Sequence, residues 1–142
     1  MVAVGRRLGA AVQQVGQGGM IFLQGDLGVG KTTLCRGILR YFGAQSAIKS
    51  PTYTLVESYK LAGQVINHFD LYRLEHPEEL EYLGIRDYFS DRYLNLIEWP
   101  DKGYGVLPPA DLTVSLSLDG RSRRLLLRGL SSVGQDFLRS WD

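Results

Sequence analysis

GDLGVGKT, residues 25–32, is the stretch that decides the fold of this chain. It satisfies the pattern G-x-x-x-x-G-K-[ST], in which a glycine-rich loop cradles phosphate groups. The apolar run MIFLQ, residues 20–24, precedes the loop and is typical of a buried strand. Apolar residues then recur at helical spacing over residues 31–42, which predicts a helix directly after the loop. A phosphate-binding loop requires this placement between a strand and a helix.

Each residue type in the loop has a physical reason. Glycines let backbone amides curl around phosphate oxygens without a Cβ clash, and the helix N-terminus adds partial positive charge. The Lys31 ammonium is expected to reach the β- and γ-phosphates, and the Thr32 hydroxyl to ligate Mg²⁺. We therefore predict that a nucleoside triphosphate, ATP by preference, and Mg²⁺ are bound by Gly28, Val29, Gly30, Lys31, Thr32 and Thr33.

Outward from the loop, strands and helices alternate early in the chain and a hairpin is expected late. Helices are expected over residues 6–15, from Pro77 onward, and over residues 133–141. Strands are expected over residues 54–59, 65–69 and 94–97, and a hairpin over 112–118 and 123–130 that turns at Asp119-Gly120. This order predicts an α/β, P-loop NTPase-like three-layer domain with a mixed sheet and a C-terminal hairpin.

Two acids stand at the ends of apolar strands, Asp70 after VINHF and Glu98 after LNLI. Taken alone, a carboxylate at a strand end is more often only solvated. Ligands of open α/β sheets gather at the C-terminal ends of strands, however, and Mg²⁺ beside phosphates takes only one or two protein ligands. With the P-loop in the same small sheet, we expect one acid to hold the metal and the other to orient the attacking water.

Two further patterns argue against other chemistries. Residues 67–70 (NHFD) have the N-x-x-D spacing of a guanine-specificity motif, but its lysine is absent and it lies too early in the chain. His68 and His76 have no cysteine or acidic partner at a spacing typical of zinc, so both are expected to be structural.

Composition favours an ordinary globular protein. The 142 residues suit a single domain over residues 1–142, with 44% hydrophobic and 22% charged residues. A net charge of +1 is too balanced for a protein that grips nucleic acid by charge alone, although a local patch is compatible with it. Cys35 is the only cysteine, and no apolar run approaches the roughly 20 residues that span a bilayer. We expect a cytoplasmic protein with no membrane association.

Five segments follow one another in order: GDLGVGKTT (25–33), SPTYTLVE (50–57), HFDLYRL (68–74), PEELEYLGIRDYF (77–89) and LIEWP (96–100). Together they resemble the TsaE family (formerly YjeE), the bacterial ATPases of tRNA threonylcarbamoyladenosine biosynthesis, over roughly residues 20–121. The resemblance implies an ATPase that works with TsaB and TsaD, which transfer a threonylcarbamoyl group to the adenosine at position 37 of tRNAs that read ANN codons. It further implies that hydrolysis resets this complex between turnovers, and that tRNA is reached only through the complex.

Residue by residue, the resemblance implies that Thr32 and Glu98 are the magnesium ligands and that Asp70 is an acid needed for hydrolysis. It places Thr52 in a segment likened to a switch loop, where its hydroxyl would sense the γ-phosphate. Ser-Pro before a β-branched run is equally a turn that enters a strand. With Lys31 on the phosphates, these assignments make Asp70, Lys31 and Thr52 the catalytic residues.

Two more positions match the family pattern. Arg121, just after the hairpin glycine, matches a nucleotide-contacting arginine, whereas the residues alone read as a solvated turn. Trp99 is expected to pack on the nucleotide, on a partner or in the core. The chain is expected to start close to its first helix, without the lead-in segment that usually precedes this helix in the family.

A phosphate-binding loop of this kind is also compatible with two other functions. A small-molecule kinase would need an acceptor pocket and an arginine-rich lid, for which the GRSRR cluster (residues 120–124) is the sole candidate. A nucleotide-gated adaptor would bind ATP without turnover and would not need a second acid at the phosphates. Phosphate release measured with and without acceptors separates the three functions.

Overall fold

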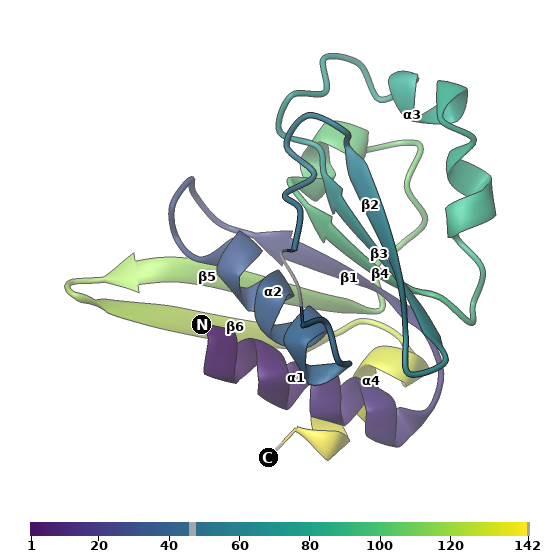
Figure 1. The fold of residues 1–142 in the computed structure, drawn as a ribbon. Helices are drawn as coiled ribbons and strands as arrows, with labels where there is room; N and C mark the ends of the chain where they lie inside the picture. The colour runs from purple at the N-terminus through teal and green to yellow at the C-terminus, as the bar shows by residue number, and fades with distance from the viewer. Residues whose placement is uncertain (46–47, 142) are drawn as a thin grey trace.

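A single six-stranded mixed sheet runs through the computed structural model, which describes residues 1–45 and 48–141 (Figure 1). Its strand order is β2-β3-β4-β1-β5-β6. β1 pairs in parallel with β4 and β5, and β3 in parallel with β4, while β2–β3 and β5–β6 are antiparallel hairpins. The elements are α1 (Val2–Val15), β1 (Gly19–Gln24), α2 (Lys31–Tyr41), β2 (Val56–Leu61), β3 (Gln64–Asp70), α3 (Glu79–Tyr82), η1 (Ile85–Tyr88), β4 (Leu94–Glu98), η2 (Pro100–Gly103), β5 (Leu112–Asp119), β6 (Ser122–Gly129) and α4 (Ser132–Ser140).

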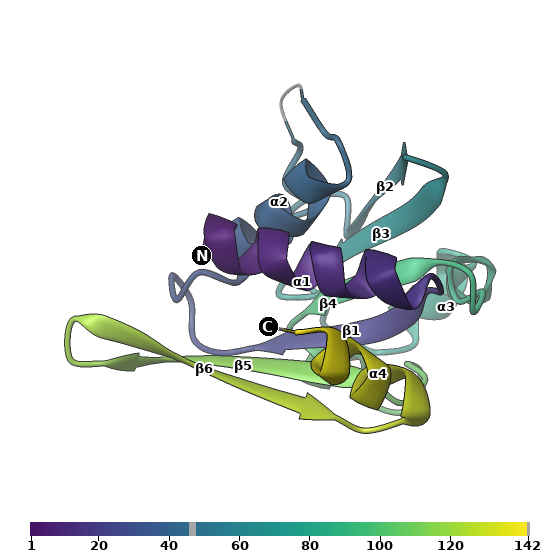
Figure 2. The ribbon, with the colours of Figure 1, turned by 90° about the horizontal axis from the view of Figure 1, so that it is seen from below.

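The sheet separates two hydrophobic cores. Helices α1, α2 and α4 lie on one face (Figure 2), and the segment with α3 and the 3₁₀ helices lies on the other. Side chains alternate between the faces along each strand: Ile21 and Leu23 of β1 join the core under the helices, whereas Met20 and Phe22 join the second core. The α/β class, the mixed sheet and the C-terminal hairpin are confirmed.

Helices α1 and α2 pack through glycines, which fixes the position of α2 over the sheet. A Cβ at Gly5 would lie 2.1 Å from the Leu34 carbonyl oxygen, and one at Gly37 would lie 2.3 Å from the Val2 carbonyl oxygen. Both neighbouring atoms belong to backbone, so neither can move aside cheaply. The two helices can therefore approach this closely only because both positions are glycines, which have no Cβ.

Several element boundaries differ from expectation. The first helix begins at Val2, and the strand expected from residue 54 begins at Val56, after a turn over residues 51–54. Pro77 lies in a turn, and α3 has only four residues, because Gly84 with a φ of 67° follows its C-terminal cap. The Glu79 carboxylate accepts from the amides of Glu75 and His76 in the preceding turn. The C-terminal hairpin turns at Gly120-Arg121, one residue later than expected. None of the helices in the described part of the chain is long and apolar enough to cross a membrane.

We expect Gly37→Ala to lower the free energy of unfolding by about 1–3 kcal/mol, the usual cost of overpacking. In an exposed helix the same change would stabilise by roughly 0.5–1 kcal/mol, so the sign of the effect reports the contact with α1. Urea unfolding of the two proteins measures it, and Arg36→Ala, an exposed neighbour on α2, is the control. An unchanged or higher midpoint in Gly37→Ala would contradict this packing.

Candidate functional site

The loop between β1 and α2 has the backbone of a phosphate cradle. Gly25, Gly28 and Gly30 have φ values of 144°, 75° and 115°, in the region that disfavours any side chain. At Gly25 a Cβ would also lie 2.4 Å from the Leu116 carbonyl oxygen. The loop then runs directly into the N-terminus of α2 at Lys31, where unpaired amides and the helix dipole favour an anion.

Two carboxylates reach the same edge of the sheet. Asp70 is the last residue of β3 and Glu98 the last of β4, and the two are paired in the parallel register. Their side chains point to the face covered by α2, because they share it with Ile66, Leu94 and Leu96 of the core under the helices. Both acids therefore lie beside the loop.

Glu98 is 2% exposed, and both of its carboxylate oxygens lie close to the Thr32 hydroxyl. Thr32 Oγ1 is 2.9 Å from Oε1 and 3.1 Å from Oε2. In octahedral magnesium coordination, with bonds of 2.0–2.1 Å, adjacent ligand oxygens lie about 2.9 Å apart. A hydroxyl and a carboxylate at this separation fit the donor set and the spacing that Mg²⁺ needs.

The Lys31 side chain is 5% exposed and folds back over its own loop. Its ammonium donates to the carbonyl oxygens of Gly25 and Asp26, the second at 3.2 Å, and lies 3.8 Å from the centre of the Trp99 ring. Burial lowers the pKa of Lys31, and the carboxylates of Glu98 and Asp70 partly offset this. A desolvated ammonium interacts strongly with a phosphate.

Asp70 is half-buried, and burial raises the pKa of its carboxyl above the ordinary value. The Tyr72 amide donates to its Oδ1 at 3.0 Å and lowers the pKa in part. A carboxylate with a raised pKa is a better proton acceptor than a solvated one, which suits a group that would orient and deprotonate water.

A pocket of about 420 Å³ lies over the loop and the two acids. Most of the residues predicted from the sequence line it: Gly28, Gly30, Lys31, Thr32, Thr33, Thr52, Asp70 and Glu98. Val29 does not, because its side chain is buried in the core under the helices. Thr52 lies in the turn before β2, and this turn also forms part of the pocket wall. Ser50 Oγ, just before the turn, lies 2.6 Å from Thr52 Oγ1.

Arg123, rather than Arg121, lines this pocket. Arg121 lies in the exposed hairpin turn, outside the antiparallel ladder. Arg123 pairs with Leu118 in that ladder, and its Nε donates to the Val29 carbonyl oxygen at 2.8 Å, which ties β6 to the loop. The GRSRR cluster (residues 120–124) includes Arg123. The local sequence does not give the hairpin register, and this register decides which of these arginines faces the loop. Contact of Arg121 with nucleotide stays a prediction.

The rest of the pocket lining consists of one aliphatic, one cationic and two aromatic side chains: Leu27, Arg73, Tyr72 and Trp99. Tyr72 and Trp99 pack with ring centroids 5.0 Å apart, and Trp99 also packs against the second core. The Arg73 guanidinium lies 4.4 Å from the ring centre of Tyr53, which is 80% exposed. In the sequence, the only indication that Arg73 lies near the site is its position three residues after Asp70.

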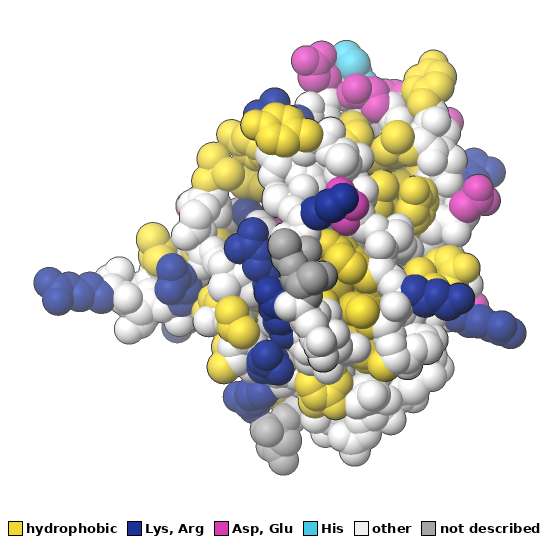
Figure 3. All heavy atoms as spheres, viewed as in Figure 1, with side chains coloured by type: hydrophobic (Ala, Val, Ile, Leu, Met, Phe, Trp, Pro, Cys, Tyr) yellow, Lys and Arg dark blue, Asp and Glu magenta, His cyan; other side chains and the backbone are white. Residues whose placement is uncertain are grey.

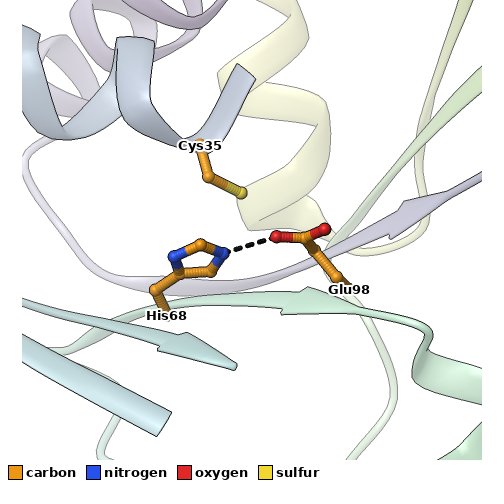
Figure 4. Close-up of side chains that lie close together, drawn as sticks. All are labelled: Cys35, His68 and Glu98. Carbon is orange, nitrogen blue, oxygen red and sulfur yellow. Dashed lines mark hydrogen bonds and ion pairs between the residues drawn. The ribbon is translucent and has the colours of Figure 1, made fainter. Parts of the chain in front are cut away.

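A buried cluster below the pocket was not foreseen from the sequence. His68, Glu98 and Cys35 lie together on β3, β4 and α2 (Figure 4). His68 Nε2 is 2.6 Å from Glu98 Oε2. Burial and the nearby carboxylates of Glu98 and Asp70 raise the pKa of the Cys35 thiol well above its usual value. His68 therefore does have acidic and thiol neighbours, but they come from distant elements and not from a local spacing.

The fold and the loop together define a P-loop NTPase-like protein. The structure of YdiB from Bacillus subtilis has the same fold, with a TM-score of 0.78 at 21% identity over 99% of this chain and 88% of that chain. The family described as threonylcarbamoyl adenosine biosynthesis protein TsaE matches residues 1–126. The chain therefore belongs to the TsaE family.

Relatives that carry the name tRNA threonylcarbamoyladenosine biosynthesis protein TsaE include one from Haemophilus influenzae and one from Rickettsia bellii. The one from Haemophilus influenzae is 51% identical over 122 residues, which is 86% of this chain and 77% of the relative. The one from Rickettsia bellii is 44% identical over 107 residues, 75% of this chain and 74% of the relative.

We expect Lys31→Ala to weaken nucleotide binding by roughly 10- to 100-fold, the loss of a hydrogen bond to a charged group worth about 1.5–3 kcal/mol. Titration of a labelled ATP analogue measures the affinity. Lys102→Ala removes the same charge from an exposed position outside the pocket and should bind like the parent. Equal affinities of Lys31→Ala and the parent would remove the phosphate-binding role of the loop.

Proposed function

We propose that this chain binds ATP with Mg²⁺ and hydrolyses the β–γ phosphoanhydride as the ATPase of tRNA threonylcarbamoyladenosine biosynthesis. Membership of the TsaE family and the names of its relatives support the pathway. The single observation that carries the hydrolytic function is the contact of Thr32, at the head of α2, with Glu98, beside Asp70 at the end of the next strand. A protein that only bound nucleotide would not need this second acid.

Each residue has a distinct role in the proposal. Lys31 leaves the carbonyl oxygens of its own loop and binds the β- and γ-phosphates. Thr32 and Glu98 hold Mg²⁺, which when bound neutralises charge on the phosphate oxygens. Asp70 accepts a proton from the attacking water, for which its raised pKa suits it. Thr52, which lines the same pocket, contacts the γ-phosphate and reports its presence to the segment before β2.

Residues 1–142 work in this proposal as one domain whose partners are TsaB and TsaD homologues. Lysine and arginine side chains gather over α1 and α2, and acids gather around α3 (Figure 3). The exposed arginines of the first group include Arg6, Arg7 and Arg36. Because the whole chain carries only +1, we propose that tRNA is reached through the partner proteins and not by charge alone.

We expect substitution of Asp70 to impair hydrolysis and substitution of Glu98 to impair Mg²⁺-dependent binding. Asp70→Ala is expected to bind ATP and Mg²⁺ almost normally and to lose hydrolysis, because the water loses its proton acceptor. Glu98→Ala is expected to lower Mg²⁺-dependent binding, because it removes one of few protein contacts to the ion. Nucleotide titration with and without Mg²⁺, together with phosphate release, separates these outcomes.

Asp91→Ala is the matched control, since Asp91 is exposed and lies outside the pocket. If Asp70→Ala releases phosphate at the parent rate, Asp70 has no catalytic role. Phosphate transfer to an added small molecule, in place of release to water, would favour the kinase function.

We predict slow hydrolysis by the isolated chain and acceleration by its partners. An arginine that stabilises the transferring phosphoryl group is worth 10³–10⁵ in rate in related NTPases. The two arginines at the pocket are both engaged elsewhere, Arg73 on the Tyr53 ring and Arg123 on the Val29 carbonyl oxygen. A partner that reorders the exposed segment around Tyr53 would free Arg73 for the phosphates.

Turnover of the chain alone, compared with turnover after TsaB and TsaD homologues are added, measures this effect. Arg73→Ala should lose the acceleration, and Arg124→Ala, an exposed arginine outside the pocket, should keep it. Fast hydrolysis by the chain alone that is lost in Arg121→Ala would mean that the site is complete without partners.

A further inference from the structure

His68 is a buried polar residue to which the proposed mechanism gives no role. It lies in the middle of β3 and is 1% exposed. Its Nε2 lies 2.6 Å from Oε2 of Glu98 (Figure 4). Oε1 of the same carboxylate lies 2.9 Å from the Thr32 hydroxyl. The imidazole and the hydroxyl therefore approach the carboxylate of Glu98 together.

Within residues 1–45 and 48–141, the second ring nitrogen of His68 has no hydrogen-bond partner. Nδ1 is buried and makes no hydrogen bond to any described residue. A polar atom buried without a partner costs free energy, so an apolar side chain would fill this position in the core more favourably. In the described part of the chain, the imidazole hydrogen-bonds only to Glu98, so the contact with that carboxylate is what distinguishes histidine at this position.

The distance between the two groups requires a proton between them. When Glu98 is ionised, as a metal ligand must be, the proton lies on Nε2 and the imidazole donates to Oε2. The carboxylate is then fixed at one oxygen, and its rotation about the terminal bond is restricted. Oε1 keeps its position next to Thr32.

We propose that His68 is a positioning residue that holds the Glu98 carboxylate in the orientation needed to bind Mg²⁺ together with Thr32. The proposal rests on the proposed function, in which Glu98 and Thr32 hold the ion. Histidines and other groups that hydrogen-bond a metal ligand orient it, and their loss typically weakens metal affinity 10- to 100-fold.

The alternative is that Cys35, His68 and Glu98 themselves bind a metal ion, since their ligand atoms lie within 4.8 Å of one another. Two ligands of a tetrahedral zinc ion, with bonds of 2.0–2.2 Å, lie roughly 3.3 Å apart. The 2.6 Å between His68 and Glu98 is shorter and corresponds to a hydrogen bond.

The test compares His68→Gln with His68→Asn. Both substitutions place a side-chain amide on β3, but only glutamine is long enough to put an N–H donor near the position of Nε2. For each variant, the affinity for a labelled ATP analogue is titrated in EDTA and then against increasing Mg²⁺. Thermal unfolding is recorded in parallel, and Cys35→Ala is the control because it alters the same cluster without touching the hydrogen bond.

We expect all variants to bind the analogue in EDTA within about twofold of the parent. The Mg²⁺ concentration for half-maximal effect should rise roughly 10-fold or more in His68→Asn and stay near the parent value in His68→Gln and Cys35→Ala. A merely structural role would lower binding in EDTA and thermal stability alike, with no rescue by glutamine.

Four outcomes would overturn the proposal. If His68→Asn responds to Mg²⁺ like the parent, or if glutamine is no better than asparagine, His68 does not position Glu98. If Cys35→Ala loses the Mg²⁺ response, the thiol is a ligand and the cluster is a metal site. If the parent itself binds the analogue equally with and without Mg²⁺, the assignment of Glu98 as a metal ligand fails, and the positioning role fails with it.

Discussion

The parallel strands β3, β4 and β1 end at one edge of the sheet, and every group of the site depends on that edge. β1 continues into the glycine-rich loop, while β4 ends at Glu98 and β3 at Asp70. The connection from β1 returns as α2, whose N-terminus therefore lies over the same edge. A shift of β4 by one residue would turn Glu98 toward the second core, because successive side chains point to opposite faces. The parallel register thus places the acids more strictly than any contact between side chains does.

The charges at this edge do not balance. Glu98 is almost fully buried and Asp70 is half-buried, while Lys31 is the one cation with a deeply buried side chain among the described residues. Buried charges need a partner or a coordinated ion, and the Thr32 hydroxyl and the His68 imidazole give Glu98 only hydrogen bonds. Phosphates would add further negative charge. A divalent cation bound in the proposed way would balance this negative charge at the carboxylates, whereas the two arginines on the rim offset the charge of the phosphates.

The sequence was sufficient for those parts of the site that depend on local pattern. The loop, the helix that follows it and the buried strands are set by residues close together in the chain, so periodicity and glycine spacing locate them. The partnership of His68 with Glu98 spans 30 positions and depends on strand order, which no local pattern contains. The presence of Arg123 in the pocket lining has a similar cause, since a turn placed one residue later decides which arginine faces the loop. The short α3 has a local cause instead, since Gly84, with a φ of 67°, ends the helical stretch that begins with the turn at Pro77.

Trp99 follows the last residue of β4 and lines the pocket. β4 ends at Glu98, and Trp99 follows with φ 59° and ψ 52°, a left-handed conformation that costs about 1–2 kcal/mol outside glycine. The turn brings the indole back over the pocket, where it packs on Tyr72 and lies under the Lys31 ammonium. A cation over a partly desolvated aromatic face is worth roughly 1–2 kcal/mol, and an aromatic pair adds about 0.5–1.5 kcal/mol. These contacts are of the size needed to offset the strain. Because they depend on where Lys31 lies, the same strained turn couples the end of β4, and with it Glu98, to the phosphate-binding loop.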